Sequence, residues 1–248
     1  MRRSASARVL SPRMLLAVAF TCGMLALAAT PRTHAAAASN APIKIGIIGT
    51  GKIGGALARH WVAAGHEVYM SSRHPGELTG LVAELGPRAH AGTPREAAAF
   101  GSVILVSIPY GAMPQIGADL QAELAGKVIL DTSNPAERRD GPMALEAQKR
   151  GAGVATAELL HSKRVVRAFN CIPAATLANE GNRQPERIAI PIGGDDAQAL
   201  QIAERLVRDA GFDPVRVGSL AQTKEFDLGQ PLATGRLTAA EMRKQLGR

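Results

Sequence analysis

The chain has 248 residues, of which 46% are hydrophobic and 20% charged, so it is long enough to form one core of one or two lobes. Residues 1–35 hold five of the 29 Lys and Arg residues and no acid, so the formal net charge of +8 falls to an excess of three in the rest of the chain. This balance gives no argument for a nucleic-acid partner. Cys171 is the one cysteine after residue 35, which excludes an intrachain disulfide there, and no group of Cys and His has metal-ligand spacing.

Residues 1–35 have the pattern of an export signal. Four arginines precede the apolar stretch Met14–Ala29, and Thr33-His34-Ala35 has the small residues of a cleavage site. Because 16 apolar residues are few for a membrane span, we expect cleavage and no stable membrane span afterwards, with an uncleaved anchor as the alternative. The sequence thus predicts an exported protein, in a bacterial periplasm, with residues 36–42 as a linker; it leaves the export route open.

A glycine-rich turn follows the first predicted strand. The run Gly49-Thr50-Gly51-Lys52-Ile53-Gly54 comes directly after the β-branched stretch Ile43–Ile48, and a helical pattern covers Ala56–Val62. In a dinucleotide-binding βα unit the first glycine permits the turn, the second admits a pyrophosphate close to the backbone, and the third lets the helix pack on the strand. This context favours a nucleotide site over a purely structural turn.

The second predicted strand, His66–Met70, indicates which dinucleotide binds. An NAD site usually has an acidic residue at its end to accept hydrogen bonds from the ribose 2′-hydroxyl. This chain has Ser71-Ser72-Arg73-His74 there instead. Two hydroxyls and a guanidinium suit a 2′-phosphate, so the sequence predicts NADP(H).

Short apolar runs then alternate with amphipathic ones, as a parallel α/β fold requires. Thr93, Pro94 and Glu96 have the spacing of a helix N-terminus with a capping box. Further strands are expected at Ala89–Ala91, Val103–Ile108, Lys127–Leu130, Arg164–Phe169, Arg187–Ile192 and Phe212–Val217, and further helices at Leu78–Leu85, Ala97–Phe100, Met113–Leu124, Met143–Arg150, Glu158–His161, Asp196–Ala210 and Thr238–Leu246. The predicted fold is a Rossmann-type, doubly wound α/β fold with a mainly parallel sheet, formed by residues 43–173, and a small mixed C-terminal lobe, residues 174–248.

Small and polar residues gather where the predicted strands end. Besides the two motifs above, they are Ser107–Tyr110, Asp131–Pro135 and Asn170–Pro173. Ligands of open α/β sheets bind outside the carboxyl ends of the strands, although such residues are also common in any loop.

At these residues the chain resembles the NADP oxidoreductases that depend on deazaflavin (coenzyme F420), and the cytosolic NADPH-flavin domain of six-transmembrane metalloreductases. The resemblance rests on Ile45–Gly54, Ser71-Ser72-Arg73, Val106-Ser107-Ile108-Pro109 and Val165-Val166-Arg167-Ala168-Phe169-Asn170. It implies that Ser72 and Arg73 hold the 2′-phosphate. It further implies that Thr50, Lys52 and Ile53 line the pyrophosphate. An export signal is unexpected in that family.

The resemblance also implies roles nearer the reaction. Ser107, Ile108 and Pro109 would border the ribose and nicotinamide, and Phe169–Pro173 would face the hydride-accepting ligand. The candidate coenzyme-binding residues are therefore Gly49, Thr50, Gly51, Lys52, Ile53, Gly54, Ser71, Ser72, Arg73, Ser107, Ile108, Pro109 and Asn170. No catalytic residue and no metal ligand is nominated, because His161, Tyr110 and Cys171 are each more readily explained as structural.

These features predict an NADP(H)-dependent oxidoreductase that transfers hydride between NADPH and a flavin or deazaflavin (coenzyme F420), a small-molecule second substrate. Two alternatives stay open. One is an NADP-dependent dehydrogenase of a small hydroxy acid or imine, and the other is a non-catalytic NADP(H)-binding sensor. A homodimer is also left open.

Overall fold

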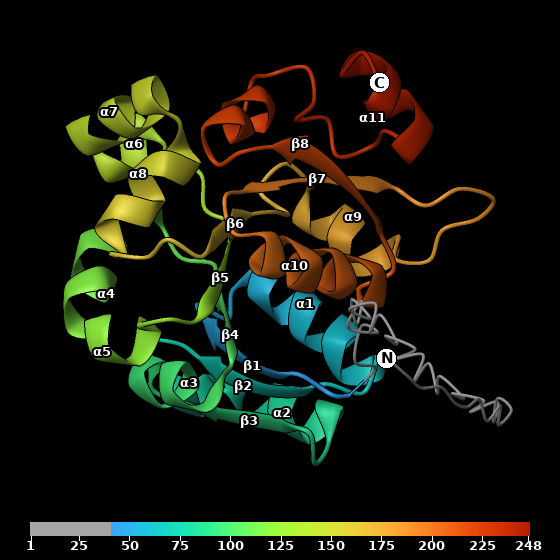
Figure 1. Ribbon diagram of the computed structural model, residues 1–248. Helices are drawn as coiled ribbons and strands as arrows, with labels where there is room; N and C mark the ends of the chain where they lie inside the picture. Colours follow the sequence, from blue (N-terminus) through green and yellow to red (C-terminus); the bar gives the residue numbers. More distant parts are fainter. Residues whose placement is uncertain (1–40) are drawn as a thin grey trace, which may run out of the picture. The chain divides into compact units, whose positions relative to one another are not determined.

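Eight strands form one sheet, in the order β3-β2-β1-β4-β5-β6-β7-β8, in the computed structural model, which describes residues 41–248 (Figure 1). Neighbouring strands are parallel except β6 and β7, which pair antiparallel. The strands are β1 Lys44–Ile48, β2 Glu67–Ser71, β3 Ala89–Gly92, β4 Val103–Val106, β5 Val128–Asp131, β6 Val165–Arg167, β7 Ala189–Gly194 and β8 Asp213–Gly218. The export signal and most of the predicted linker lie outside the described residues.

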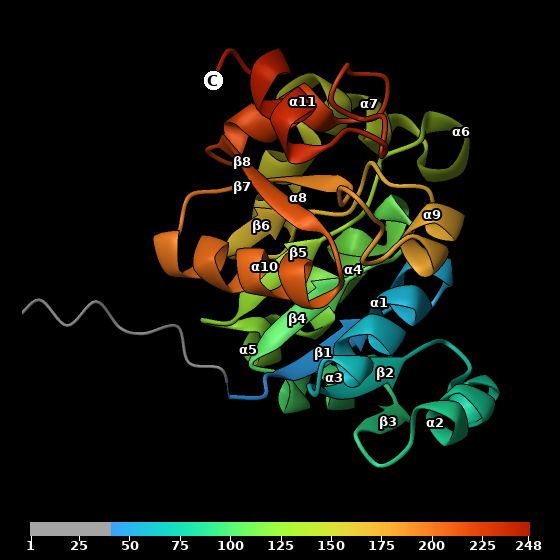
Figure 2. The same cartoon turned by 90° about the vertical axis from the view of Figure 1, so that its right-hand side faces the viewer.

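Helices cover both faces of this sheet, which confirms the doubly wound α/β fold (Figures 1 and 2). Helices α1 (Lys52–Ala63), α9 (Ala174–Asn179) and α10 (Ala197–Asp209) pack with the side chains of one face, which include Ile45 and Ile47. The other helices are α2 Thr79–Leu85, α3 Pro94–Phe100, α4 Met113–Asp119, α5 Gln121–Leu124, α6 Glu137–Asp140, α7 Pro142–Arg150, α8 Ala152–Leu159 and α11 Ala239–Gln245, and three 3-10 segments are η1 Pro75–Leu78, η2 Tyr110–Ala112 and η3 Ala221–Phe226.

The central strands are apolar because both of their faces are covered. All four residues of β4 are buried, and alternate side chains of β1 belong to opposite cores: Ile47 to the core of α1 and α10, and Ile48 to that of α4 and α8. Such continuous apolar strands are typical of parallel sheets. The Trp61 indole N–H donates to the Leu206 carbonyl at 2.9 Å and so fastens α1 to α10.

Residues 174–248, expected as a small C-terminal lobe, continue the same sheet with β7 and β8. Phe226, Leu232 and Met242 form a third apolar cluster with side chains of β7 and β8. Residues 41–248 make up one compact unit. No helix in this unit is long and apolar enough to cross a membrane.

Several predicted elements have other bounds. The helix expected at 158–161 begins earlier, since α8 spans Ala152–Leu159, and α9 was not expected at all. The strand expected to reach Phe169 ends at Arg167, and Phe169 itself has a φ of 59°, which no strand accommodates. The helix expected at 113–124 breaks at Leu120, where φ is −114°.

Candidate functional site

The glycines of the β1–α1 turn have three different surroundings. Gly49 has a φ of 96°, and a Cβ there would meet the Ser107 carbonyl oxygen at 2.4 Å. A Cβ on Gly54 would meet the Gly49 carbonyl oxygen at 2.4 Å, whereas a Cβ on Gly51 would have no atom within 4 Å. Gly49 and Gly54 are therefore required by the turn and by helix packing, and Gly51 leaves open space next to the backbone.

The N-terminus of α1 lacks the partners that helix starts normally have. Gly51 is the N-cap and offers no side chain, and the first turn holds no acidic residue. The Thr50 hydroxyl oxygen is buried and has no hydrogen-bond partner in the described part of the chain, residues 41–248. Unsatisfied N–H groups at the positive end of the helix dipole, beside open space and an unused hydroxyl, fit an anionic group such as the pyrophosphate of NADP(H).

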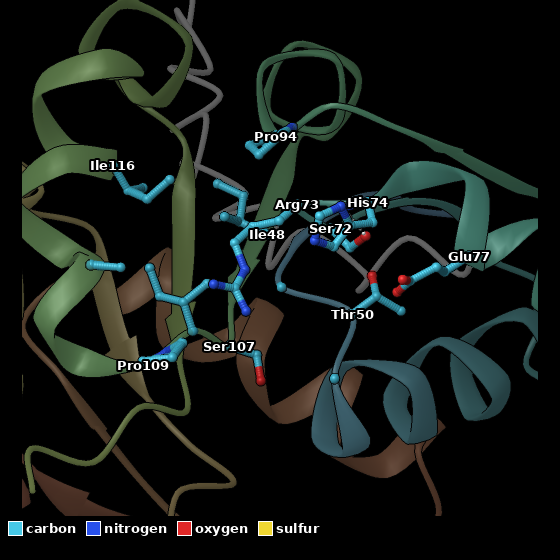
Figure 3. Close-up of a pocket in the computed structure, with 14 residues that line it drawn as sticks. Ile48, Thr50, Ser72, Arg73, His74, Glu77, Pro94, Ser107, Pro109 and Ile116 are labelled. Atoms are coloured by element: carbon cyan, nitrogen blue, oxygen red, sulfur yellow. Dashed lines mark hydrogen bonds between the residues drawn. The ribbon is translucent and has the colours of Figure 1, made fainter. Parts of the chain in front are cut away.

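A pocket of about 380 Å³ lies at the carboxyl ends of β1, β2 and β4, directly over this turn (Figure 3). It is lined by Ile48, Gly49, Thr50, Gly51, Ser72, Arg73, His74, Glu77, Pro94, Ser107, Ile108, Pro109, Ala112 and Ile116. The lining combines the charged side chains of Arg73 and Glu77 with the mainly apolar side chains of residues 107–116. A ligand that carries both phosphate groups and a planar ring suits this mixed lining.

Arg73 extends from the end of β2 into the pocket (Figure 3). Its guanidinium has no hydrogen bond or ion pair with any of residues 41–248. The Ser72 hydroxyl oxygen accepts a hydrogen bond from the His74 backbone N–H at 3.0 Å, which leaves the hydroxyl proton available to a ligand. Glu77 also lines the pocket.

Eight of the thirteen candidate coenzyme-binding residues line this pocket: Gly49, Thr50, Gly51, Ser72, Arg73, Ser107, Ile108 and Pro109. The other five are elsewhere. Lys52 is exposed on the first turn of α1, Ile53 is partly buried against the core, and Gly54 is buried. Ser71 is fully buried and donates its hydroxyl to the Ile47 carbonyl at 2.7 Å.

Asn170 lies outside the pocket, in a buried polar network at the ends of β5 and β6. Its side-chain N–H groups donate to the Phe226 carbonyl at 3.0 Å and to Asn134 Oδ1 at 3.4 Å. The neighbours expected to face a second ligand, Phe169, Cys171 and Ile172, are buried. Phe169 packs edge to face with Trp61 and Phe212.

Arg167 is the centre of that network and is fully buried. It donates to Asp131 Oδ2 at 3.0 Å and to the Ser133 carbonyl at 2.8 Å, and it contacts Asp227 Oδ1 at 2.8 Å. A guanidinium is suited to such a position because its five N–H donors can serve several acceptors at once. The network joins the sheet to the segment that follows η3.

Three further polar side chains were weighed from the sequence. Tyr110 is buried, and burial raises the pKa of its phenol to about 12. Burial likewise raises the pKa of the Cys171 thiol to about 12, which keeps it protonated and unreactive at neutral pH. His161, with a φ of 49°, follows α8 and does not line the pocket.

Some pocket residues could not be assigned from motifs. Glu77, Pro94 and Ile116 come from η1, α3 and α4, and nothing in their local sequence indicates a ligand. His74 belongs to the same run as Ser72 and Arg73, so its position beside the pocket could be predicted from that motif. Among residues 41–248 no group of three or more His, Cys, Asp or Glu side chains could hold a metal ion.

Residues 44–135 match the family model described as NADP oxidoreductase, coenzyme F420-dependent. This part of the chain is similar to the F420-dependent NADP oxidoreductases. The match includes every residue that lines the pocket. The resemblance stated from the motifs is therefore confirmed.

The chain is also similar in sequence to named reductases. Metalloreductase STEAP3 of Rattus norvegicus is 33% identical over 190 residues, 74% of this chain and 36% of that protein. F420-dependent NADP reductase of Methanothermobacter thermautotrophicus is 26% identical over 204 residues, 77% of this chain and 87% of that protein. The chain thus spans about a third of the length of the metalloreductases it matches. Hypothetical protein SMa0349 of Sinorhizobium meliloti is 27% identical in sequence; its structure has a TM-score of 0.67 over 80% of this chain and 96% of that one.

Proposed function

We propose that the protein is an NADPH-dependent reductase that transfers hydride to a flavin or deazaflavin. The observation that carries the coenzyme assignment is the pocket over the β1–α1 turn, where the uncapped start of α1 and the unpaired Arg73 side chain face one cavity. The start of α1 follows β1 and Arg73 follows β2, so these two cationic features lie one strand apart along the edge of the sheet. The pyrophosphate and the 2′-phosphate of one dinucleotide require this arrangement.

Each pocket residue then has a defined part. The N–H groups at the start of α1 and the Thr50 hydroxyl bind the pyrophosphate, and Ser72 and Arg73 bind the 2′-phosphate. Ser107, Ile108 and Pro109 place the nicotinamide against the end of β4 and exclude water from one side of it. NADPH supplies the hydride; the protein binds and orients.

The apolar residues that line the pocket after β4 favour a flavin-type acceptor over a hydroxy acid or imine. Reduction of a carbonyl or imine needs a proton donor near the nicotinamide. Around Ser107 the lining side chains are Ile108, Pro109, Ala112 and Ile116, and the nearby Tyr110 phenol is buried. Hydride transfer to a flavin or deazaflavin ring needs no such donor. The similarity to the F420-dependent NADP reductase of Methanothermobacter thermautotrophicus also supports this acceptor, because it extends over 87% of that protein.

The test is NADPH oxidation by the purified protein with FMN, FAD and an 8-hydroxy-5-deazaflavin as separate acceptors, followed at 340 nm. Turnover with one of these acceptors and none with small imines or keto acids supports the proposal. Turnover with the small substrates alone would favour the dehydrogenase. Tight NADPH binding with no turnover in any case would favour the sensor.

A further inference from the structure

A second cavity, of about 260 Å³, lies beside the end of β5. Five polar side chains line it, together with Pro135 and Leu228; the polar ones are Asn134, Gln148, Lys224, Asp227 and Gln230. Asn134 follows β5, and Ser107–Pro109 of the coenzyme pocket follow β4, the parallel neighbour of β5. Because β4 and β5 are adjacent parallel strands, both cavities take lining residues from the same edge of the sheet.

The walls of this cavity are held by the buried Arg167. One guanidinium nitrogen donates to Asn134 Oδ1 at 3.1 Å and contacts Asp227 Oδ1 at 2.8 Å, so one side chain fixes both walls. The Asn134 amide also donates to the Asn170 carbonyl at 2.7 Å. Loop residues 134 and 227 are thus fixed by buried contacts, as the first contacts of a binding site must be.

Several polar groups of the cavity keep unused hydrogen-bonding capacity. The Gln230 side chain has no partner among residues 41–248, and Gln148 uses only its amide N–H group, which donates to the Pro135 carbonyl at 2.9 Å. The Lys224 ammonium donates one hydrogen bond, to the Lys149 carbonyl at 2.9 Å, and retains two more donors. Leu228, at the same cavity, is 61% exposed, an unusual state for a large apolar side chain.

We propose that this cavity binds the pyrimidinedione edge of the flavin or deazaflavin acceptor. That edge presents a carbonyl, an N–H and a second carbonyl in a row, which side-chain amides such as those of Gln148 and Gln230 recognise with paired donors and acceptors. Leu228 supplies an apolar surface for the ring. The rest of the ring then extends toward the end of β4, where the nicotinamide of the proposed reductase lies.

Lys224 has a specific part in this arrangement. The nicotinamide C4 gives a hydride to N5 of the flavin, or to C5 of the deazaflavin; NADPH becomes NADP⁺, and the acceptor gains two electrons and one proton. The added electron pair places negative charge on the N1–C2 carbonyl side of the pyrimidinedione, until a proton arrives from solvent. An ammonium at that edge stabilises the charge where it develops.

The inference rests on the proposed function, and one experiment tests both separately. Riboflavin and an 8-hydroxy-5-deazaflavin are titrated by fluorescence into the full chain saturated with NADP⁺, and NADPH oxidation is measured in parallel. The variants are Gln230→Ala and Lys224→Met, and the matched controls are Gln201→Ala on α10 and Lys244→Met on α11, both exposed and away from this cavity.

We expect Gln230→Ala to weaken flavin binding by about three- to tenfold, the effect of one neutral hydrogen bond, with NADP⁺ affinity unchanged. Lys224→Met is expected to lower the turnover rate more than flavin affinity, because its charge acts on the product side. If the wild type binds and reduces the flavin but both variants equal their controls, the cavity assignment is wrong and the reductase stands. If the wild type neither binds nor reduces any flavin or deazaflavin, the proposed function fails and the cavity assignment fails with it.

Discussion

The Arg73 guanidinium has no protein partner within residues 41–248 although it lies in a pocket, so its charge is available to a ligand. Arg73→Glu removes a charge-assisted contact to the 2′-phosphate and adds repulsion, but leaves the NADH site intact. We expect NADPH affinity to fall by about ten- to a hundredfold while NADH affinity changes little. Paired fluorescence titrations with the two coenzymes measure this.

Arg88→Glu is the matched control, because Arg88 is exposed and lies outside the pocket. An unchanged ratio of NADPH to NADH affinity in Arg73→Glu would show that the 2′-phosphate binds elsewhere. An equal fall in both variants would indicate a general effect of charge on binding.

Arg167 differs from Arg73 in that its guanidinium pairs with two carboxylates inside the protein. Arg167→Met leaves the carboxylates of Asp131 and Asp227 without their buried partner, at 3.0 and 2.8 Å respectively. We expect this substitution to lower the free energy of unfolding by about 3–5 kcal/mol. Urea denaturation followed by circular dichroism gives the value.

Arg59→Met provides the comparison, since Arg59 pairs with Glu84 on the surface and both side chains are about half exposed. Its loss should cost under about 1 kcal/mol. Similar costs for the two variants would mean that the interior carboxylates find other partners or become hydrated.

At the scale of single elements, the glycines of the turn before α1 differ in whether the fold requires them. Gly51 meets no protein atom where a Cβ would be, unlike Gly49 and Gly54. We expect Gly51→Ala to fold with an unchanged melting temperature and to bind NADPH at least about tenfold more weakly, because the methyl group occupies the approach of the pyrophosphate.

Gly80→Ala in α2 is the control for this prediction, as its Cβ would also have open space. It should bind NADPH as the wild type does. A Gly51→Ala variant with normal affinity would place the pyrophosphate away from the start of α1.

Elements with strong local signals were predictable from the sequence, and those fixed by distant contacts were not. The capping box of Thr93 and Glu96 is present at the start of α3, with reciprocal hydrogen bonds, because all of its partners lie within four residues. Helix α9 has six residues and packs on α1, which supplies apolar contacts that no local pattern reveals. The early end of β6 has the same kind of cause, since Phe169 turns away to pack on Trp61 and Phe212.

The same distinction applies to the candidate site. The sequence motifs singled out Gly49, Gly51 and the Ser72-Arg73 pair, and these residues line one pocket because they follow the adjacent strands β1 and β2. Glu77 and Ile116 reach the pocket from separate elements. Lys224 and Gln230 line the second cavity with Asn134, although they follow it by 90 and 96 residues in the chain. Their proximity depends on sheet order, which the sequence alone did not specify.

At the scale of the whole molecule, the buried Tyr110 phenol and Cys171 thiol make the free energy of unfolding depend on pH in the alkaline range. Burial raises the pKa of Tyr110 and of Cys171 to about 12, from usual values of 10.0 and 9.0. The folded protein therefore retains protons that the unfolded chain releases. This contribution is fully present below about pH 9 and is lost as the pH rises toward 12, so the free energy of unfolding falls with increasing pH in that window.

Urea denaturation at pH 8.0, 9.5 and 10.5 measures this slope. The double variant Tyr110→Phe, Cys171→Ala should show a shallower decrease than the wild type, by up to about 1.4 kcal/mol per pH unit for each group removed. Equal slopes in the two proteins would show that other groups cause the alkaline instability.

No residue lines both the coenzyme pocket and the second cavity: the first takes its lining from residues 48–116 and the second from residues 134–230. The part that matches the family model, residues 44–135, ends where the second cavity begins. The two halves of the sheet edge can therefore diverge independently. A lineage can keep one hydride donor and acquire a new acceptor by changing only the later part of its chain, and a protein engineer can follow the same route.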